Sequence, residues 1–392
     1  MSVDFDQPIG RKNTNCTKYD GMTPGFGSNE LMPLWIADMD FPVAEEITAA
    51  IRRRAEHPVY GYNVFPAGYF ESFTAWTARH HGWQAEAEWV CHTPGVLSAL
   101  STAILTFTEK GDKVLIQPPV YFPFRSTIEA LDRQVLNNQL RYEDGRFSVD
   151  FDDLEEKAKE AKLFVLCSPH NPSGRVWSRE ELKRMEAICQ KNGLLVFSDE
   201  IHADIVYQPA RHILFPSLSD WSREHCILAM SPSKTFNIAG LEASFITIPD
   251  REKRECFQHV LRYGLHLANC NTFGIAAAQA AYEEGDAWHR QLMAYLKGNL
   301  DHLDSALRTR VPQVRLVRAE ATYIPFLDMQ GLDLAPDGLA SFLRDRVRAA
   351  LNPGPSFGPG GEGFMRINIA TQRANLERFV ERLEAETAKP HV

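Results

Sequence analysis

Short apolar runs alternate with amphipathic stretches between residues 42 and 284, and this alternation is the strongest constraint on the fold. Most of these runs are continuously apolar or β-branched, which is typical of strands covered on both faces. The candidate strands are Trp89–Thr93, Lys113–Gln117, Gln134–Gln139, Leu163–Cys167, Leu194–Ser198, Cys226–Met230 and Ser244–Ile248. Helical periodicity lies between them, as in residues 96–107 and 179–191. The alternation predicts an α/β fold with a mostly parallel, seven-stranded sheet.

The last hundred or so residues follow a different pattern. A long helical stretch over 286–307 precedes short strand-like and helical segments, a Gly/Pro-rich loop at 352–363 and a final helical stretch. A chain of 392 residues also exceeds the length, roughly 250–300 residues, at which one hydrophobic core stops growing. We therefore expect an extended N-terminal arm at 1–41, a large domain at 42–284 and a smaller α+β domain at 285–392.

Charge and cysteine content exclude several classes of protein. The 42 Lys and Arg against 51 Asp and Glu give a net charge of −9, which disfavours nucleic-acid binding. No apolar run approaches the ~18 residues of a membrane helix, and the acidic N-terminus predicts no secretory signal. The seven cysteines include no Cys-x-x-Cys pair, which favours a reducing compartment such as the cytoplasm, and no metal-ligand spacing occurs.

Polar residues follow the predicted strands where each strand ends. In an open α/β sheet, ligands bind off the carboxyl ends of the strands, so we expect these residues to meet. They occur in the segments Pro94-Gly95-Val96, Pro118-Pro119-Val120-Tyr121, residues 168–174 (SPHNPSG), Asp199-Glu200-Ile201-His202 and residues 231–236 (SPSKTF). The sequence thus predicts a ligand site at this edge.

Lys234 lies in one of these segments, and its neighbours suit one cofactor, pyridoxal 5′-phosphate. The aldehyde of this cofactor forms a Schiff base with a lysine. Asp199, after a buried strand, can pair with the pyridine nitrogen and keep it protonated, so that the ring accepts electrons. Ser231 and Ser233, with the helix N-terminus at Gly95, can hold the phosphate.

The same cofactor needs further partners, and the sequence offers them. Asn171 can donate to the phenolic oxygen, and Tyr121 can cover a ring face. Arg366 has the planar fork that binds an amino-acid carboxylate. Taken singly, each has an ordinary structural interpretation: Asp199 as a helix N-cap, Asn171 as a turn residue, Tyr121 as a packing aromatic.

The sequence resembles the fold-type I pyridoxal-phosphate enzymes of the class I/II aminotransferase superfamily. Within it, the chain is most similar to the MalY/PatB group of carbon–sulfur β-lyases, which includes cystathionine β-lyases and cystalysin. The resemblance runs from the arm to the last helix. Its motifs are residues 13–20 (NTNCTKYD), 34–41 (LWIADMDF), 60–62 (YGY), 118–121 (PPVY), 168–174 (SPHNPSG), 198–202 (SDEIH), 231–237 (SPSKTFN) and 366–370 (RINIA).

The resemblance implies a role for each site residue. The catalytic residues are Lys234, Tyr121 and Asp199, with Lys234 moving the Cα proton. The residues implied to bind the cofactor are Gly95, Val96, Tyr121, Asn171, Asp199, His202, Ser231, Ser233, Lys234 and Tyr62. Arg366, Ala37 and Tyr62 are implied to bind the substrate. The family forms homodimers, in which Tyr62 reaches the site of the partner subunit.

Two positions depart from the aminotransferase pattern. His202 replaces a tyrosine that many aminotransferases carry three residues after the aspartate, as it does in the lyase-like group. Glu242 stands eight residues after the lysine, where aminotransferases often have a phosphate-binding arginine. Because a carboxylate repels a phosphate, Glu242 must point away or be paired. Both departures weaken the aminotransferase reading more than the lyase one.

The implied reaction is β-elimination from L-cystathionine or a cysteine-type substrate, giving a thiol, pyruvate and ammonia. A transaminase that acts on an amino acid uses the same residues for its first steps and remains open. So does a regulatory protein that keeps the cofactor site but acts through a protein partner. A nicotinamide dehydrogenase is disfavoured, because no Gly-x-Gly-x-x-Gly follows a predicted strand.

Overall fold

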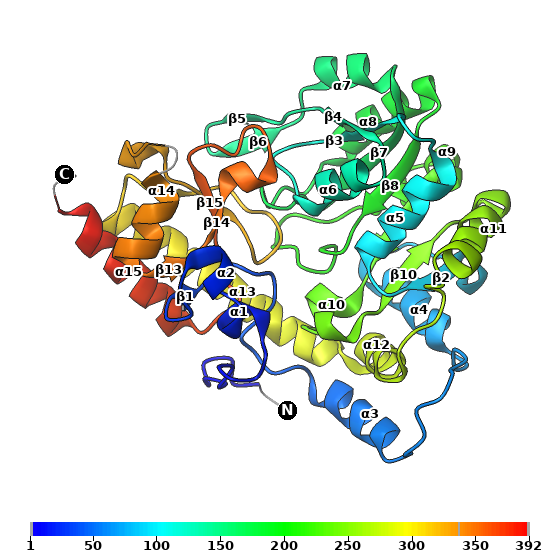
Figure 1. Ribbon diagram of the computed structural model, residues 1–392, viewed down its shortest axis with the longest axis horizontal. Helices are drawn as coiled ribbons and strands as arrows, with labels where there is room; N and C mark the ends of the chain where they lie inside the picture. The colour runs from blue at the N-terminus through cyan, green and yellow to red at the C-terminus, as the bar shows by residue number, and fades with distance from the viewer. Residues whose placement is uncertain (1–2, 336–337, 390–392) are drawn as a thin grey trace.

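A computed structural model describes residues 3–335 and 338–389 (Figure 1). Its largest sheet has seven strands. The strands are β2 (Val90–Thr93), β3 (Lys113–Ile116), β4 (Gln134–Asn137), β7 (Ala161–Cys167), β8 (Leu195–Asp199), β9 (Cys226–Met230) and β10 (Ser244–Thr247). Their order is β2-β10-β9-β8-β7-β3-β4. Only β10 runs antiparallel to its neighbours. The predicted α/β fold with a mostly parallel sheet is confirmed.

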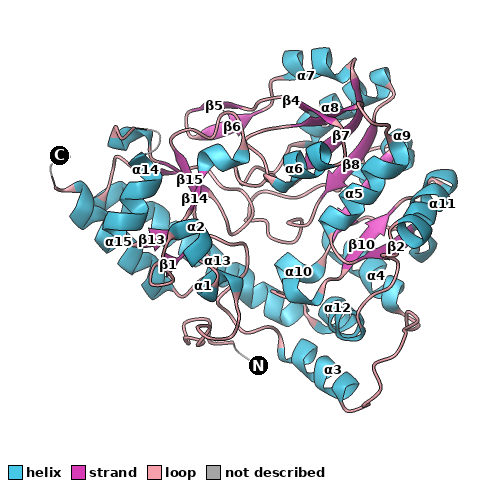
Figure 2. Ribbon diagram, in the orientation of Figure 1, coloured by secondary structure: helices cyan, strands magenta, loops and turns pink. Residues whose placement is uncertain are grey.

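Helices cover both faces of this sheet (Figure 2). Alternate strand residues point to opposite faces, so Val114 packs with α5 (Val96–Phe107), α6 (Pro123–Ala130) and α11 (Arg251–His259) in one hydrophobic cluster. Its neighbour Leu115 lies in the cluster on the other face. That second cluster includes residues of α4 (Tyr69–His81), α8 (Arg179–Asn192) and α12 (Thr272–Glu284). The continuously apolar strands are thus buried from both sides.

The C-terminal part holds a smaller antiparallel sheet with the order β11-β12-β15-β14. Its strands are β11 (Arg315–Leu316), β12 (Phe326–Asp328), β14 (Asn352–Pro353) and β15 (Phe364–Arg366), and its long helices are α13 (Asp286–Arg310) and α15 (Arg373–Thr387). The helical pattern that the sequence shows over 339–348 corresponds to one turn of α-helix, α14 (Gly338–Ser341), continued by a π-helical segment at Phe342–Val347. The domain division at residues 41 and 284 stays a prediction, and residues 1–2, 336–337 and 390–392 lie outside the described part.

Other elements connect these layers. They are α1 (Thr17–Asp20), α2 (Thr23–Phe26), β1 (Met32–Pro33), α3 (Glu45–Ala55), β5 (Arg141–Glu143), β6 (Arg146–Ser148), α7 (Phe151–Ala158), α9 (Asp220–Glu224), α10 (Pro232–Thr235) and β13 (Ala349–Ala350). Within the described residues, no helix combines the length and apolar character needed to cross a bilayer.

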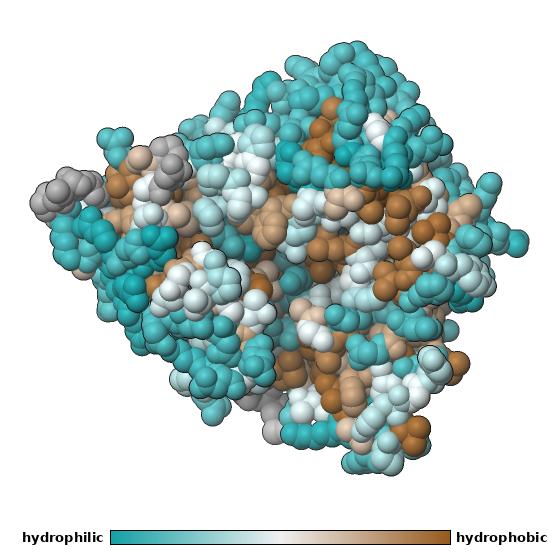
Figure 3. All heavy atoms as spheres, viewed as in Figure 1, coloured by the Kyte–Doolittle hydropathy of each residue, from teal (hydrophilic) through white to brown (hydrophobic). Residues whose placement is uncertain are grey.

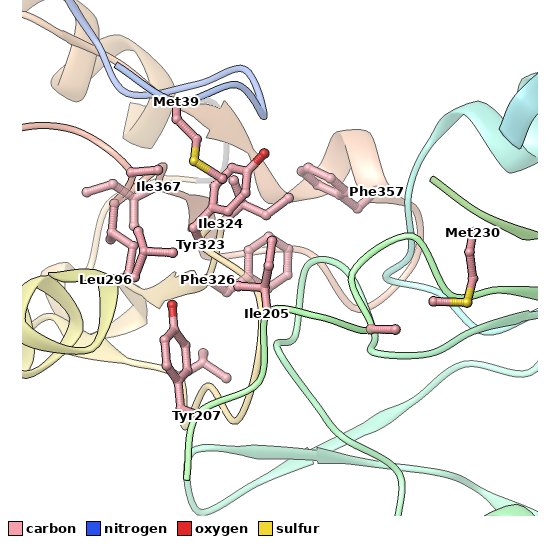
Figure 4. Close-up of a cluster of buried hydrophobic side chains, with 14 of the residues drawn as sticks. Met39, Ile205, Tyr207, Met230, Leu296, Tyr323, Ile324, Phe326, Phe357 and Ile367 are labelled. Carbon is pink, nitrogen blue, oxygen red and sulfur yellow. The ribbon is translucent and has the colours of Figure 1, made fainter. Parts of the chain in front are cut away.

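The arm is less extended than the sequence predicts. Two short helices form in it. The carboxylate of Asp20, the last residue of α1, accepts hydrogen bonds from the backbone N–H groups of residues 13, 14 and 16, and Asn29 Oδ1 accepts one from Thr23 N at the start of α2. The following strand β1 pairs in parallel with β13 of the C-terminal part. Figure 4 shows where arm and body meet: Met39 packs close to Tyr323 and Ile324, in the same hydrophobic cluster as Ile205. One buried core therefore joins the N-terminal, central and C-terminal segments.

Residues 35–41, here called the strap, cross this junction without forming a helix or strand. A buried backbone carbonyl without a hydrogen bond is costly, so an irregular segment needs partners from elsewhere. In the strap, side chains from distant positions supply them. The donors are Arg366 to Trp35, Asn368 to Ile36 and Asp38, Lys234 and Tyr323 to Ala37, Lys18 to Asp38, Arg11 and Asn237 to Met39, Gln372 to Asp40, and Asn237 to Phe41.

Two cations fix the acidic residues of the strap. Arg11 Nη2 lies 2.7 Å from Asp38 Oδ2, and its Nη1 lies 2.8 Å from Asp40 Oδ1. The fully buried Lys18 lies 3.0 Å from Asp40 Oδ2. Removing one member of a buried ion pair leaves an uncompensated charge, so this cluster ties residues 11–18 to the strap. The arm motif at residues 13–20 thus helps to hold the strap in place.

Asn368→Ala tests how much the strap depends on its side-chain partners. The buried Asn368 donates to Ile36 O and Asp38 O at 2.6 Å each and accepts from Ala370 N at 2.7 Å. At about 1 kcal/mol for each hydrogen bond, we expect the free energy of unfolding in urea to fall by about 3 kcal/mol. Asn192→Ala, which removes one bond at the end of α8, should cost about 1 kcal/mol or less. Equal losses in the two variants would contradict this role.

Candidate active site

A cavity of about 380 Å³ opens at the carboxyl ends of the large sheet. It lies between the strap, the strand-end loops of the sheet and the C-terminal part. The predicted site residues that line it are Ala37, Gly95, Val96, Tyr121, Asn171, Asp199, His202, Ser231, Ser233, Lys234 and Arg366. The structure therefore brings together residues that are up to 329 positions apart in the chain, and of the predicted set leaves out Tyr62.

Lys234 lies in α10, directly after β9. Its Nζ donates a hydrogen bond to Ala37 O at 2.8 Å, so the strap holds the amine at the cavity wall. Burial, and then the positive charge of Arg366, lower the pKa of Lys234 to about 8. An amine with this pKa is partly neutral near pH 7–8, as a nucleophile or a base must be.

Asp199 ends β8 and is buried. Its Oδ1 accepts a hydrogen bond from Ile201 N at 3.1 Å, and no cation among residues 3–335 and 338–389 forms an ion pair with it. Burial raises the pKa of Asp199 to about 7. A buried carboxyl without a cationic partner is costly when ionised, so this position suits a ligand that brings a positive charge.

Arg366 reaches the cavity from β15 of the C-terminal part. Its Nη2 donates to Asn352 Oδ1 at 2.8 Å and to Trp35 O at 3.1 Å, and the guanidinium lies 4.9 Å from the ring centre of Phe357. Its Nη1 donates to Asn171 Oδ1 at 3.2 Å, which leaves the Asn171 amide nitrogen available as a donor. Burial lowers the pKa of Arg366 to about 10, so the group stays charged at neutral pH.

Two buried nitrogen atoms of cavity-lining residues have no hydrogen-bond partner within the described residues. They are His202 Nδ1 and Arg366 Nε. Burial lowers the pKa of His202 to about 3, so its imidazole is neutral and can donate one hydrogen bond. Buried polar atoms are almost always satisfied, so unpartnered ones in a cavity indicate a polar ligand.

The N-terminus of α5 supplies an anion site at the same cavity. No side chain caps this helix at Gly95, so its first backbone N–H groups are free for a ligand. Ser231 is partly committed elsewhere: its Oγ lies 2.7 Å from Ala243 O and accepts from Ser233 N to cap α10. Together with the buried acid and the lysine, this anion site fits a ring that carries a cationic nitrogen, an aldehyde and a phosphate.

Tyr62 lies away from this cavity. It is fully exposed in the loop between α3 and α4, which runs along the outer edge of the molecule in Figure 1. The sequence expectation assigns Tyr62 to the site of a partner subunit, so its position here is compatible with that role and does not test it.

The structure also adds residues that the sequence did not indicate. Asn352 and Phe357 come from the Gly/Pro-rich segment 352–363, of which Asn352 forms part of β14, and both contact Arg366. Tyr323 holds the strap through Ala37 O at 3.0 Å. Asn368, which binds the strap, is a further residue of this kind. Its position could have been inferred from the sequence, because it stands two residues after Arg366 and thus on the same face of an extended chain.

Comparison with known proteins agrees with this geometry. The model of the family "Aminotransferase class I and II" matches residues 29–383. Cystathionine β-lyase PatB of Bacillus subtilis is 40% identical over 98% of this chain and 99% of its own. Protein MalY of Escherichia coli is 32% identical over 96% and 97%. Cystalysin from Treponema denticola, solved with pyridoxal 5′-phosphate, has a TM-score of 0.94 at 31% identity and covers 98% and 99%.

The chain therefore belongs to the class I and II aminotransferase family. Within that family, these relatives are the proteins of the MalY/PatB group, so the resemblance inferred from the motifs is confirmed.

The lowered pKa of Lys234 predicts an unusual labelling profile. In the cofactor-free protein, acylation of Lys234 should rise with pH and level off above about 8, because only the neutral amine reacts. In the urea-unfolded chain, the same residue should keep gaining reactivity up to about pH 10.4, the value of an unperturbed lysine. Mass spectrometry of the Lys234 peptide over a pH series measures both profiles. Identical profiles would show that burial does not perturb this amine.

Proposed function

We propose that this protein is a pyridoxal-phosphate-dependent carbon–sulfur β-lyase acting on L-cystathionine or a related S-substituted cysteine. The observation that carries the proposal is the convergence of Lys234, Asp199 and Arg366 on one cavity. When bound, the cofactor supplies a cationic ring that accepts the electron pair left when a Cα proton is removed. Two relatives that align with 90% or more of this chain, PatB of Bacillus subtilis and a protein of Corynebacterium glutamicum, are cystathionine β-lyases, which favours elimination over transamination.

Each residue has a defined task in this proposal. Asp199 holds the positive charge on the ring nitrogen, and this charge in turn favours the ionised carboxylate. Asn171 and the neutral His202 donate hydrogen bonds towards the phenolic oxygen. Tyr121 covers one face of the ring. The first turn of α5 and Ser233 bind the phosphate.

Lys234 and Arg366 act on the substrate. The guanidinium of Arg366 binds the α-carboxylate with two parallel hydrogen bonds and fixes the orientation of Cα. The neutral amine of Lys234 then takes the Cα proton, and the thiolate leaves Cβ. After addition of one water, the products are the thiol, pyruvate and ammonia. The pKa of about 8 matches Lys234 to this proton transfer near neutral pH.

We also propose a homodimer in which Tyr62 completes the site of the partner subunit. The loop that carries it exposes Val59, Tyr60, Tyr62 and Val64 in one stretch. Figure 3 shows further hydrophobic residues at the surface where α3, α5 and α12 lie in Figure 1. Contiguous exposed apolar surface of this kind is typical of protein interfaces.

A reducing location such as the cytoplasm is compatible with the thiols. All seven cysteines are free, and burial raises the pKa of Cys91 and Cys270 to about 12, so both stay protonated. We propose that they serve as packing residues.

A product assay tests the activity. With the cofactor and L-cystathionine but no keto acid, we expect sustained release of pyruvate and thiol. Lys234→Ala should lower this release at least about 1,000-fold, because it removes both the cofactor anchor and the base. The matched variant Lys191→Ala, on the exposed side of α8, should keep the wild-type rate. If conversion requires an added keto acid, the protein is a transaminase and the proposal is wrong.

A mixing experiment tests the shared site. Tyr62→Ala and Lys234→Ala homodimers should both be impaired. After subunit exchange, half of the dimers are hybrids with one site free of both substitutions, so activity should recover to about a quarter of wild type. Recovery no greater than the sum of the two parents would refute a site shared through Tyr62.

A further inference from the structure

Among the residues that the structure describes, four side chains with a formal charge line the active-site cavity, and the proposed function uses three of them. Lys234, Asp199 and Arg366 have the tasks given above, whereas Glu242 has none. A second carboxylate in a cavity that must hold a phosphate is unfavourable, because the two negative charges repel each other. A ligand that carries a positive charge would compensate this second carboxylate.

The structure places Glu242 in the wall that also forms the anion site. It follows the turn at residues 239–241 and directly precedes Ala243, whose carbonyl oxygen lies 2.7 Å from Ser231 Oγ. Its backbone lies in the left-handed region, with a φ of 52°, which asparagine or glycine adopts more readily. Departures of this kind cluster at functional sites.

The carboxylate of Glu242 is also free to bind. Within residues 3–335 and 338–389, it forms no ion pair and accepts no hydrogen bond, and the residue is exposed. The neighbouring Cys270 thiol donates to the backbone oxygen of Glu242, at 4.0 Å, and not to its carboxylate. Glu242 is thus an unpaired negative group at the cavity.

The bound substrate leaves one direction for its side chain. Its α-carboxylate goes to Arg366, on the C-terminal side of the cavity, and its amine goes to the position of the Lys234 amine. With the α-carboxylate on Arg366 and the Cα hydrogen facing Lys234, the remaining substituent of Cα, the side chain, points away from both groups, into the rest of the cavity that Glu242 also lines. Glu242 is the charged lining residue there that remains without a task.

We propose that Glu242 binds an ammonium group on the departing thiol and so selects substrates whose leaving group carries a positive charge. The inference rests on the proposed lyase function and deepens it. The homocysteine half of cystathionine carries such an ammonium group. That half also ends in a carboxylate, whose charge the ammonium group offsets. A leaving group that ends in a carboxylate and has no ammonium group is disfavoured, because it meets both Glu242 and the phosphate.

Three S-substituted cysteines of similar length test this selectivity. S-(2-aminoethyl)-L-cysteine ends in an ammonium group, S-propyl-L-cysteine ends in a methyl group, and S-carboxymethyl-L-cysteine ends in a carboxylate. The readout is kcat/KM for thiol release, expressed as the ratio of the aminoethyl to the propyl substrate. Comparing this ratio between variants cancels the different intrinsic leaving abilities of the thiols.

We expect Glu242→Gln to lower the aminoethyl-to-propyl ratio about two- to fivefold, as for an ion pair formed by an exposed carboxylate. Glu242→Lys should raise the relative rate of the carboxymethyl substrate. In the wild type, added salt should lower the ratio, since screening weakens exposed charge pairs. The matched control Glu252→Gln, an exposed glutamate of α11, should keep the wild-type ratio.

An unchanged aminoethyl-to-propyl ratio in Glu242→Gln would overturn the inference. Tighter cofactor binding in an absorbance titration would then show that Glu242 acts on the phosphate. A weaker dimer in sedimentation would instead show that Glu242 pairs with a partner subunit. Failure of the lyase proposal would look different, because then none of the three substrates, including the uncharged one, would release thiol.

Discussion

The active site depends on the hydrogen bonds that hold the strap, residues 35–41. An irregular buried segment has no ladder to satisfy its carbonyl groups, so it is stable only when side chains reach it. Here these side chains come from the arm, from the loop after β9 and from the C-terminal sheet, and they include Lys234 and Arg366. The cavity therefore exists where three distant parts of the chain meet, and the bonds that fold the strap also position the reactive groups.

Burial explains the electrostatics of the site. It raises the pKa of Asp199 to about 7 and lowers those of Lys234 and Arg366 to about 8 and 10. Each shift means that the charged form lacks solvation in the free protein. A ligand with a cationic ring nitrogen and an anionic carboxylate or phosphate supplies the missing partners. The free protein has already lost the solvation of these groups, so a ligand that pairs with them is favoured. Because such a ligand binds the folded chain, cofactor binding should raise the free energy of unfolding.

The sequence predicts much of this arrangement, for identifiable reasons. Strands such as β9 are apolar and bounded by turn residues, and the polar groups that follow them must meet at one edge of the sheet. The sequence does not reveal contacts between residues that are far apart in the chain. Nothing local to Asn352 indicates that its strand, β14, pairs with β15 opposite Arg366, and nothing local to Phe357 indicates that its ring lies against the Arg366 guanidinium. The short helices of the arm likewise involve side chains that turn back on the nearby backbone, Asp20 onto residues before α1 and Asn29 onto the start of α2.

The carbonyl of Ala37 has two donors, Lys234 at 2.8 Å and Tyr323 at 3.0 Å. This redundancy has a consequence for the resting and working forms of the protein. When the lysine amine is engaged elsewhere, the tyrosine still satisfies the oxygen, so the departure leaves no orphaned acceptor in the interior. The Lys234 amine can therefore leave Ala37 O without exposing an unpaired buried carbonyl. The strap then keeps its conformation while Lys234 changes hydrogen-bond partners.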